Sequence, residues 1–219
     1  MRAVVFDLDG TLVHFDLDME ALKRELLTVL SRVGVPASLF SVKDSMTDLL
    51  DKVEAYIRAS GLGEEAVKRI WDEAFKAIER FEEKALHTAR LVPGAYEVLA
   101  TLKKKGLKIG LFTLNSSAVA VNVLKRLGIS RFFDVMVARD LVEDVKPNPA
   151  HLSRVLEELG VRPEEAAVVG DTPFDIRCAK KVGALAIGIT TGRATEEELR
   201  RAGADFIIRY LSELLPLLG

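Results

Sequence analysis

Residues 4–12, VVFDLDGTL, carry two aspartates, Asp7 and Asp9, at the end of an apolar run that breaks at Gly10. An Asp-Gly pair between apolar runs is typical of a tight β-hairpin, in which RAVVF and TLVHF would pair as neighbouring strands. The alternative is a strand buried on both faces, because AVVFDL is apolar on both sides of the chain. The remainder of the sequence decides between these two interpretations.

From residue 91 onward, helical and strand patterns alternate along the chain. Each amphipathic helix pattern is followed by a short apolar run, and these runs are LKIGLFT (107–113), FFDVMVA (132–138), EAAVVG (165–170), ALAIGIT (184–190) and DFIIR (205–209). Strict alternation predicts a mostly parallel sheet with helices on both faces. We therefore interpret residues 3–8 as the first strand of this sheet. The predicted fold class is α/β, a Rossmann-like doubly wound parallel sheet with an inserted all-α cap domain.

The insert follows directly after the first strand. Three stretches, 17–34, 42–61 and 63–87, place apolar residues at steps of three and four, as amphipathic helices do. We expect their apolar faces to pack on one another, because the polar faces mix Glu with Lys and do not suit a membrane surface. The predicted domains are a catalytic core of residues 1–14 and 90–219 and a helical cap of residues 15–89, with hinges near 13–16 and 88–92.

Composition excludes several classes of protein. The chain has 219 residues, 49% of them hydrophobic, and its 31 Lys and Arg against 33 Asp and Glu give no basic excess that would attract nucleic acid. A single cysteine, Cys178, rules out an internal disulfide framework and fits a reducing compartment; its helical context predicts buried packing. No apolar run approaches the ~20 residues of a membrane helix. We predict a cytoplasmic monomer or homodimer whose partner is a small molecule, with no membrane or nucleic-acid partner.

Polar side chains follow four of the predicted strands at the point where each strand ends. In doubly wound sheets the carboxyl ends of the strands form the ligand site, so we expect these side chains to gather there. Each of these side chains alone could belong to an ordinary loop residue or a helix cap, and for Asp175 a capping role is as well supported as a functional one. They are Asp7 and Asp9 after the first strand, Thr113 and Asn115 after the second, Lys146 after the third, and Asp171 and Asp175 after the fourth.

The chemistry of this set is consistent. Clustered carboxylates resist joint ionisation, and a hard divalent cation such as Mg²⁺, which prefers oxygen ligands, relieves that repulsion. Asp7, Asp171 and Asp175 can supply such ligands. One acid of the first strand can attack while the other handles protons. A lysine, hydroxyl groups and helix N-termini at the same edge suit a phosphoryl group.

These motifs resemble those of the haloacid dehalogenase superfamily, in its phosphoglycolate-phosphatase-like branch with a type 1 helical cap. FDLDGTL matches the first family motif, LFTLNS the second, Lys146 in VKPNP the third and VVGDTPFD the fourth. Leu114 stands between Thr113 and Asn115, where many relatives have Asn directly after the Thr, so Asn115 is a secondary candidate without an assigned role.

The resemblance implies roles for the remaining residues. Asp7 would be the nucleophile that forms an aspartyl-phosphate, and Asp9 the general acid for the leaving oxygen and later the base for water. Mg²⁺ would be held by Asp7, the backbone carbonyl of Asp9 and Asp171, with Asp175 supporting the metal shell. Thr113 and Lys146 would hold the phosphoryl oxygens.

The sequence therefore predicts a Mg²⁺-dependent phosphatase for small phosphate monoesters such as phosphoglycolate, with a cap that closes over the site and sorts substrates. One alternative is a sugar phosphomutase of the same fold, which would need cap groups that rebind a sugar phosphate and exclude water. Another is a receiver-like phospho-signalling module, which also uses acids, Mg²⁺, a Thr and a Lys. A receiver, however, carries its phospho-acceptor on a later strand and has no helical insert.

Overall fold

A computed structural model of the chain describes residues 1–41, 44 and 46–218. The chain forms two compact units, one made of Met1–Phe15 with Leu86–Gly219 and the other of Asp16–Ala85. The second unit is thus an insertion into the first.

The first unit is built on a six-stranded sheet in which all neighbouring strands are parallel. The strand order is β5 (Val135–Ala138), β4 (Lys108–Thr113), β1 (Ala3–Phe6), β6 (Ala166–Gly170), β7 (Leu185–Ile189) and β8 (Phe206–Ile208). Every residue of β1 is fully buried, as a central strand covered on both faces requires. The interpretation of this segment as a parallel strand is confirmed, and the hairpin interpretation is wrong.

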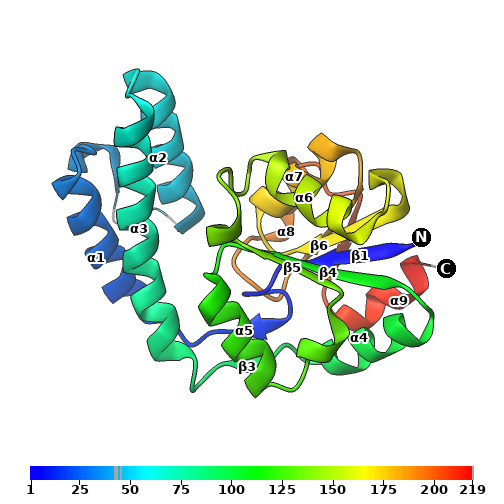
Figure 1. The fold of residues 1–219 in the computed structure, drawn as a ribbon. Helices are drawn as coiled ribbons and strands as arrows, with labels where there is room; N and C mark the ends of the chain where they lie inside the picture. The colour runs from blue at the N-terminus through cyan, green and yellow to red at the C-terminus, as the bar shows by residue number, and fades with distance from the viewer. Residues whose placement is uncertain (42–43, 45, 219) are drawn as a thin grey trace. The chain divides into compact units, whose positions relative to one another are not determined.

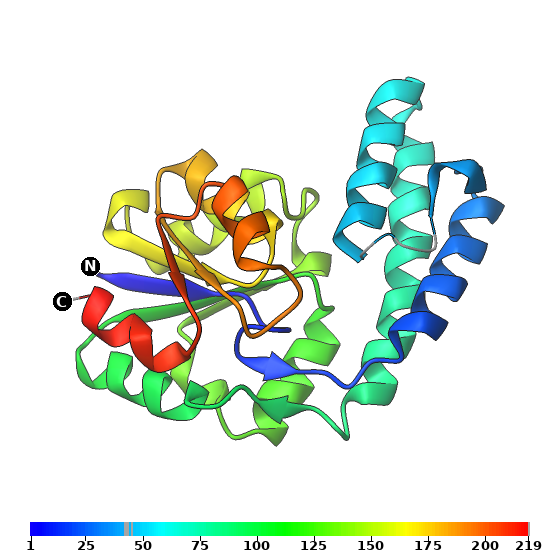
Figure 2. The ribbon, with the colours of Figure 1, turned by 180° about the vertical axis from the view of Figure 1, so that it is seen from behind.

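Helices cover both faces of the sheet (Figures 1 and 2). One face carries α6 (Pro149–Leu159), α7 (Pro173–Val182) and α8 (Glu196–Arg201), and the other carries α4 (Ala95–Lys104), α5 (Ser117–Arg126) and α9 (Leu214–Leu217). The predicted α/β class is confirmed. The strands are shorter than their apolar runs by one to three residues. The difference is largest for β5, because Phe132, at the start of FFDVMVA, ends a 3-10 helix, Ser130–Phe132.

The core beneath α6 and α7 contains alternate residues of β1, Ala3 and Val5, so Val4 and Phe6 face the opposite layer. Cys178 belongs to the same core, and burial raises the pKa of its thiol to about 12. A thiol that stays protonated at neutral pH is a poor nucleophile, and the prediction that Cys178 serves packing is confirmed.

The described part of the second unit contains three helices, α1 (Met19–Arg32), α2 (Met46–Ser60) and α3 (Glu64–Ala85), with a short 3-10 helix at Ala37–Leu39. Asp18 caps α1, since its carboxylate accepts a hydrogen bond from the Ala21 N–H at 2.9 Å. The predicted helices match in order and type; residues 42, 43 and 45 of the stretch 42–61 lie outside the described part of the chain. Buried side chains of all three helices repeat at helical spacing, among them Leu22, Leu26, Leu49, Val53, Ile70 and Ala74.

A second, two-stranded sheet was not expected from the sequence. Strand β2 (Val13–His14) pairs antiparallel with β3 (Arg90–Leu91), and the Val92 N–H donates to the Leu12 carbonyl at 2.9 Å. Two residues of TLVHF therefore do form a strand, but this strand pairs with the segment that returns from the insert and not with RAVVF. The two chain segments that lead into and out of the insert are held together by these hydrogen bonds.

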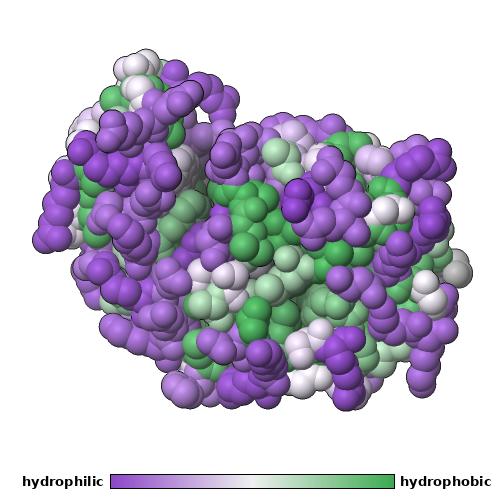
Figure 3. Space-filling view, viewed as in Figure 1, coloured by the Kyte–Doolittle hydropathy of each residue, from purple (hydrophilic) through white to green (hydrophobic). Residues whose placement is uncertain are grey.

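Figure 3 shows apolar side chains gathered on the sheet-bearing unit in the area where β4 and β5 lie in Figure 1. Large apolar side chains are exposed at both edges of the sheet, Phe206 in β8 and Leu141 shortly after β5. None of the helices described here is long and apolar enough to cross a bilayer. Whether the chain is a monomer or a homodimer stays a prediction.

Candidate active site

The candidate site lies where three central strands end. Asp7 follows β1, Thr113 is the last residue of β4, and Asp171 follows β6, so neighbouring strands bring them to one edge of the sheet. All three are buried, and the Asp7 N–H continues the ladder by donating to the Val169 carbonyl at 2.9 Å. This is the edge at which open parallel sheets bind ligands.

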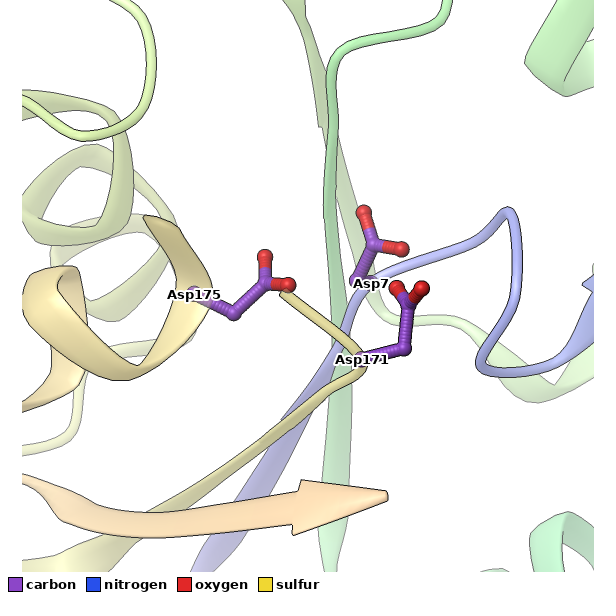
Figure 4. A group of neighbouring side chains, drawn as sticks. All are labelled: Asp7, Asp171 and Asp175. Atoms are coloured by element: carbon purple, nitrogen blue, oxygen red, sulfur yellow. The ribbon is translucent and has the colours of Figure 1, made fainter. Parts of the chain in front are cut away.

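Three buried carboxylates form a cluster at this edge. Asp7, Asp171 and Asp175, the last in the first turn of α7, each place an oxygen within 4.8 Å of the other two. Figure 4 shows Asp175 directed from its helix toward the other two acids. Burial raises the pKa of Asp7 to about 7, a shift that Lys146 opposes and Asp175 reinforces. Burial, followed by the charges of Asp7 and Asp175, raises the pKa of Asp171 well above its ordinary value.

Lys146 lies between two of these acids. Its Nζ donates to Asp7 Oδ1 at 2.6 Å and to Asp175 Oδ1 at 2.6 Å, and it lies 3.8 Å from the centroid of the Phe112 ring. Burial by itself lowers the pKa of this ammonium, but Asp175 and Asp7 together raise the pKa above its usual value. Lys146 thus binds two of the three acids of the cluster, Asp7 and Asp175.

Asp175 serves as a helix cap and a site residue at once. Its Oδ2 accepts the Thr172 N–H at 3.0 Å and the Thr172 hydroxyl at 2.6 Å, while Oδ1 accepts the Lys146 ammonium. The cap that the sequence suggested as an alternative is present, and it fixes the carboxylate that holds the lysine.

Thr113 and Asn115 contact each other. The Thr113 hydroxyl donates to Asn115 Oδ1 at 2.7 Å, and the Asn115 N–H donates to Thr113 Oγ1 at 3.1 Å. Ser116 follows as the cap of α5 by accepting the Val119 N–H. Asn115 thus orients the hydroxyl of Thr113.

Asp9 lies apart from the cluster of three acids. The chain turns after Asp7, with Gly10 at φ 86° and its N–H bonded to the Val13 carbonyl at 2.8 Å. Asp9 Oδ1 accepts the Phe15 N–H at 3.4 Å, and Oδ2 accepts the Arg193 guanidinium. The turn separates the side chains of the two acids of the first motif.

Sequence reasoning missed the loop after β7. Besides binding Asp9 through its side chain, Arg193 donates its backbone N–H to Asp171 Oδ2 at 2.8 Å. Gly192 passes so close that a Cβ at this position would lie 1.9 Å from the same oxygen. Thr191 donates its hydroxyl to the Gly10 carbonyl at 2.7 Å. The signal was available, because TGRA (191–194) comes after the predicted strand 184–190, as the four motifs come at or after the ends of theirs.

The cluster fits a divalent cation. Its donors are carboxylate oxygens, the ligand type that hard cations prefer, and they bring more negative charge than Lys146 neutralises. Burial and the charges of neighbouring acids raise the pKa values of Asp7 and Asp171, and a cation bound beside them would favour their ionised forms.

Comparison with known proteins places the chain in a family. A model of the family described as haloacid dehalogenase-like hydrolase matches residues 1–183, which include all four motifs but not Arg193. The chain is 30% identical over 220 residues to a phosphoglycolate phosphatase of Yersinia pestis, covering 100% of this chain and 94% of that protein. It is 29% identical over 223 residues to the pyrophosphatase PpaX of Halalkalibacterium halodurans, covering 100% and 97%. A solved HAD phosphatase from Thermococcus onnurineus shares 29% identity with a TM-score of 0.64, covering 100% of this chain and 98% of that one.

Proposed function

The chain belongs to the haloacid dehalogenase-like hydrolases, and from that premise we propose that it is a Mg²⁺-dependent phosphatase that carries the phosphoryl group on Asp7. The observation that carries the proposal is the Lys146 bridge between Asp7 and Asp175, beside Asp171, at the carboxyl edge of the sheet. It combines a nucleophile, a cation for phosphoryl oxygens and a set of metal ligands in one buried place.

In the first step, an Asp7 carboxylate oxygen attacks phosphorus and the bond from phosphorus to the leaving oxygen breaks. Lys146 and Thr113 would hold the phosphoryl oxygens; the Thr113 hydroxyl, whose one proton goes to Asn115 Oδ1 in this structure, would turn toward the phosphoryl group to donate to it. Asp7, Asp171 and the Asp9 carbonyl are the proposed metal ligands. Bound Mg²⁺ would supply positive charge that keeps the carboxylates ionised and offsets charge on the phosphoryl group.

Asp9 moves the proton in both steps. It gives a proton to the leaving oxygen in the first step and takes one from the attacking water in the second. The water oxygen then bonds to phosphorus, phosphate is released and the Asp7 carboxylate is regenerated. The separate position of Asp9, outside the three-acid cluster, supports this role because the same carboxylate need not also neutralise the metal.

The names of the relatives suggest the kind of substrate. One acts on phosphoglycolate and the other on pyrophosphate, and in both molecules the leaving group is itself an anion. We propose a small phosphorylated metabolite of this type as the substrate. The helical unit Asp16–Ala85 is the proposed cap that contributes to its selection.

A panel of phosphate monoesters and pyrophosphate, assayed for phosphate release with Mg²⁺ and with excess chelator, tests the proposal. Activity should vanish on chelation and return with Mg²⁺. Asp7→Asn should lose more than about 10³-fold in kcat, beyond the effect of one missing hydrogen-bond donor. Undiminished hydrolysis in chelator would exclude the metal, and near-normal turnover by Asp7→Asn would exclude this nucleophile.

A further inference from the structure

We propose that Arg193 selects substrates whose leaving group carries an anionic group, a carboxylate or a second phosphoryl group, close to the leaving oxygen. The inference rests on the proposed phosphatase function and adds a specificity residue that lies in the sheet-bearing unit, outside the four motifs.

Lys146 and Arg193, two cations that contact acids of the site, differ in accessibility. Lys146 has a side chain only 2% exposed and is enclosed by Asp7 and Asp175. The Arg193 side chain is 38% exposed while its guanidinium binds Asp9. A solute can therefore reach the Arg193 guanidinium, whereas Lys146 is committed to the acids that surround the phosphoryl position.

The partner of Arg193 places it on the leaving-group side. Asp9 is the proposed proton donor to the leaving oxygen, and Arg193 binds the same carboxylate. When a leaving oxygen takes its proton from Asp9, the two hydrogen bonds of that carboxylate would join it to the guanidinium over about 5–8 Å. An anionic group bonded one carbon away from that oxygen, or the second phosphorus of a pyrophosphate, falls in this range. A guanidinium forms two parallel hydrogen bonds with carboxylate and phosphate groups, which an uncharged alcohol does not offer.

The loop that carries Arg193 is fixed by its backbone and by a neighbouring hydroxyl. The Arg193 N–H bonds Asp171 at 2.8 Å, the Ala194 N–H bonds the Asp171 carbonyl at 3.3 Å, and the Thr191 hydroxyl bonds the Gly10 carbonyl. None of these contacts uses the Arg193 side chain. Substituting that side chain should therefore keep these contacts of the loop and remove the guanidinium, whose charge also opposes the rise that burial causes in the pKa of Asp171; that second effect acts on all substrates alike.

The test compares two esters of equal length, phosphoglycolate and 2-hydroxyethyl phosphate, with pyrophosphate as a third arm, on the full chain with Mg²⁺. The readout is the ratio of kcat/KM for the anionic substrate to that for the neutral ester. Arg193→Met should lower this ratio about 10- to 100-fold, the value of a charge-assisted hydrogen bond, with most of the change in KM. Arg193→Lys should restore part of it, because the charge remains but the paired donors do not. Arg201→Met, which removes an exposed arginine paired with Glu197 on α8, should leave the ratio unchanged.

The substrate that loses most identifies the anion as a carboxylate or a phosphoryl group. Equal loss on every substrate in Arg193→Met would show that the residue only positions Asp9 and would overturn the inference. A binding measurement separates the anion site from the phosphatase function. Calorimetry would measure the affinity for 3-phosphonopropionate, which is anionic at the far end, and for 3-hydroxypropylphosphonate, which is neutral there; neither can be hydrolysed. If no ester is turned over but the anionic analogue still binds more tightly through Arg193, the phosphatase function is wrong and the anion site stands. If esters are turned over and Arg193→Met changes neither the kcat/KM ratio of the esters nor the ratio of the affinities of the two analogues, the anion site is wrong.

Discussion

Replacing Gly192 by alanine should disable the site through a single contact. A Cβ at this position would lie 1.9 Å from Asp171 Oδ2 and 2.4 Å from Asp171 Cγ, whereas ordinary van der Waals contact begins at 3.4 Å. The methyl group and the carboxylate oxygen must therefore separate by 1.5 Å, from 1.9 to 3.4 Å. Gly192 has no positive φ, so the substitution adds no backbone strain and its effect comes from the contact alone.

The displaced group is a proposed metal ligand. A misplacement of about 1 Å in a reacting constellation costs about 10²-fold in rate, so we expect Gly192→Ala to lower kcat/KM by about 10²-fold or more on every substrate. The Mg²⁺ concentration for half-maximal activity should rise, because the displaced Asp171 carboxylate would no longer be positioned to bind the cation. Overpacking of this size costs about 1–3 kcal/mol of folding free energy, and a domain of ordinary stability remains folded.

Phosphate release at a series of Mg²⁺ concentrations measures both effects, with circular dichroism and thermal unfolding to confirm that the variant is folded. Gly63→Ala is the matched control, since a Cβ there would meet nothing within 4 Å. A folded Gly192→Ala with wild-type kcat/KM and an unchanged Mg²⁺ requirement would refute the reasoning. An equal loss in Gly63→Ala would show that the effect is not specific to Asp171.

Three further results are expected. Asp9→Asn should release roughly one equivalent of aryl alcohol from an aryl phosphate and then stall, with the phosphoryl group found by mass spectrometry on the peptide that carries Asp7; normal turnover would contradict the assignment. Burial lowers the pKa of His151 from 6.5 to about 4. As the pH falls from 6.5 to about 4, the unfolded chain takes up a proton at His151 before the folded chain does, so the wild type should lose about 3 kcal/mol of unfolding free energy relative to His151→Gln. Unfolding free energies of the two proteins that change in parallel with pH would contradict this expectation. Lys146→Met should cost about 3–5 kcal/mol in urea unfolding with chelator, because Asp7 and Asp175 lose their buried partner, and adding Asp175→Asn should recover part of this; an unchanged midpoint would count against the ion pairs.

The parallel sheet could be predicted because its signals are local and repeated. Each later strand of the sheet is an apolar run that follows an amphipathic helix in the sequence, and the burial of β1 on both faces appears directly in residues 3–6. The cluster of Asp7, Asp171 and Asp175 followed from the same pattern, since the carboxyl ends of neighbouring parallel strands meet at one edge.

The parts that were missed depend on contacts between distant segments. Strands β2 and β3 have two residues each, too few to show any periodicity, and their pairing joins the beginning and end of the insert. The pair of Asp9 and Arg193 joins residues 184 positions apart. His151 interrupts the buried face of α6, where its Nε2 lies 3.0 Å from the Val137 carbonyl, and no local pattern announces that partner.

Asp175 shows why a structural explanation of a residue does not weaken a functional one. The sequence offered two readings of this acid, a cap of α7 and a member of the site, and treated them as competing. A carboxylate has two oxygens, and here Oδ2 accepts both hydrogen bonds from Thr172 while Oδ1 accepts the Lys146 ammonium. The cap holds the carboxylate in one orientation, and that orientation directs Lys146 toward Asp7. Because the helix N-terminus, the lysine and the proposed nucleophile are linked through one side chain, the capping motif is part of the means by which the fold positions the site.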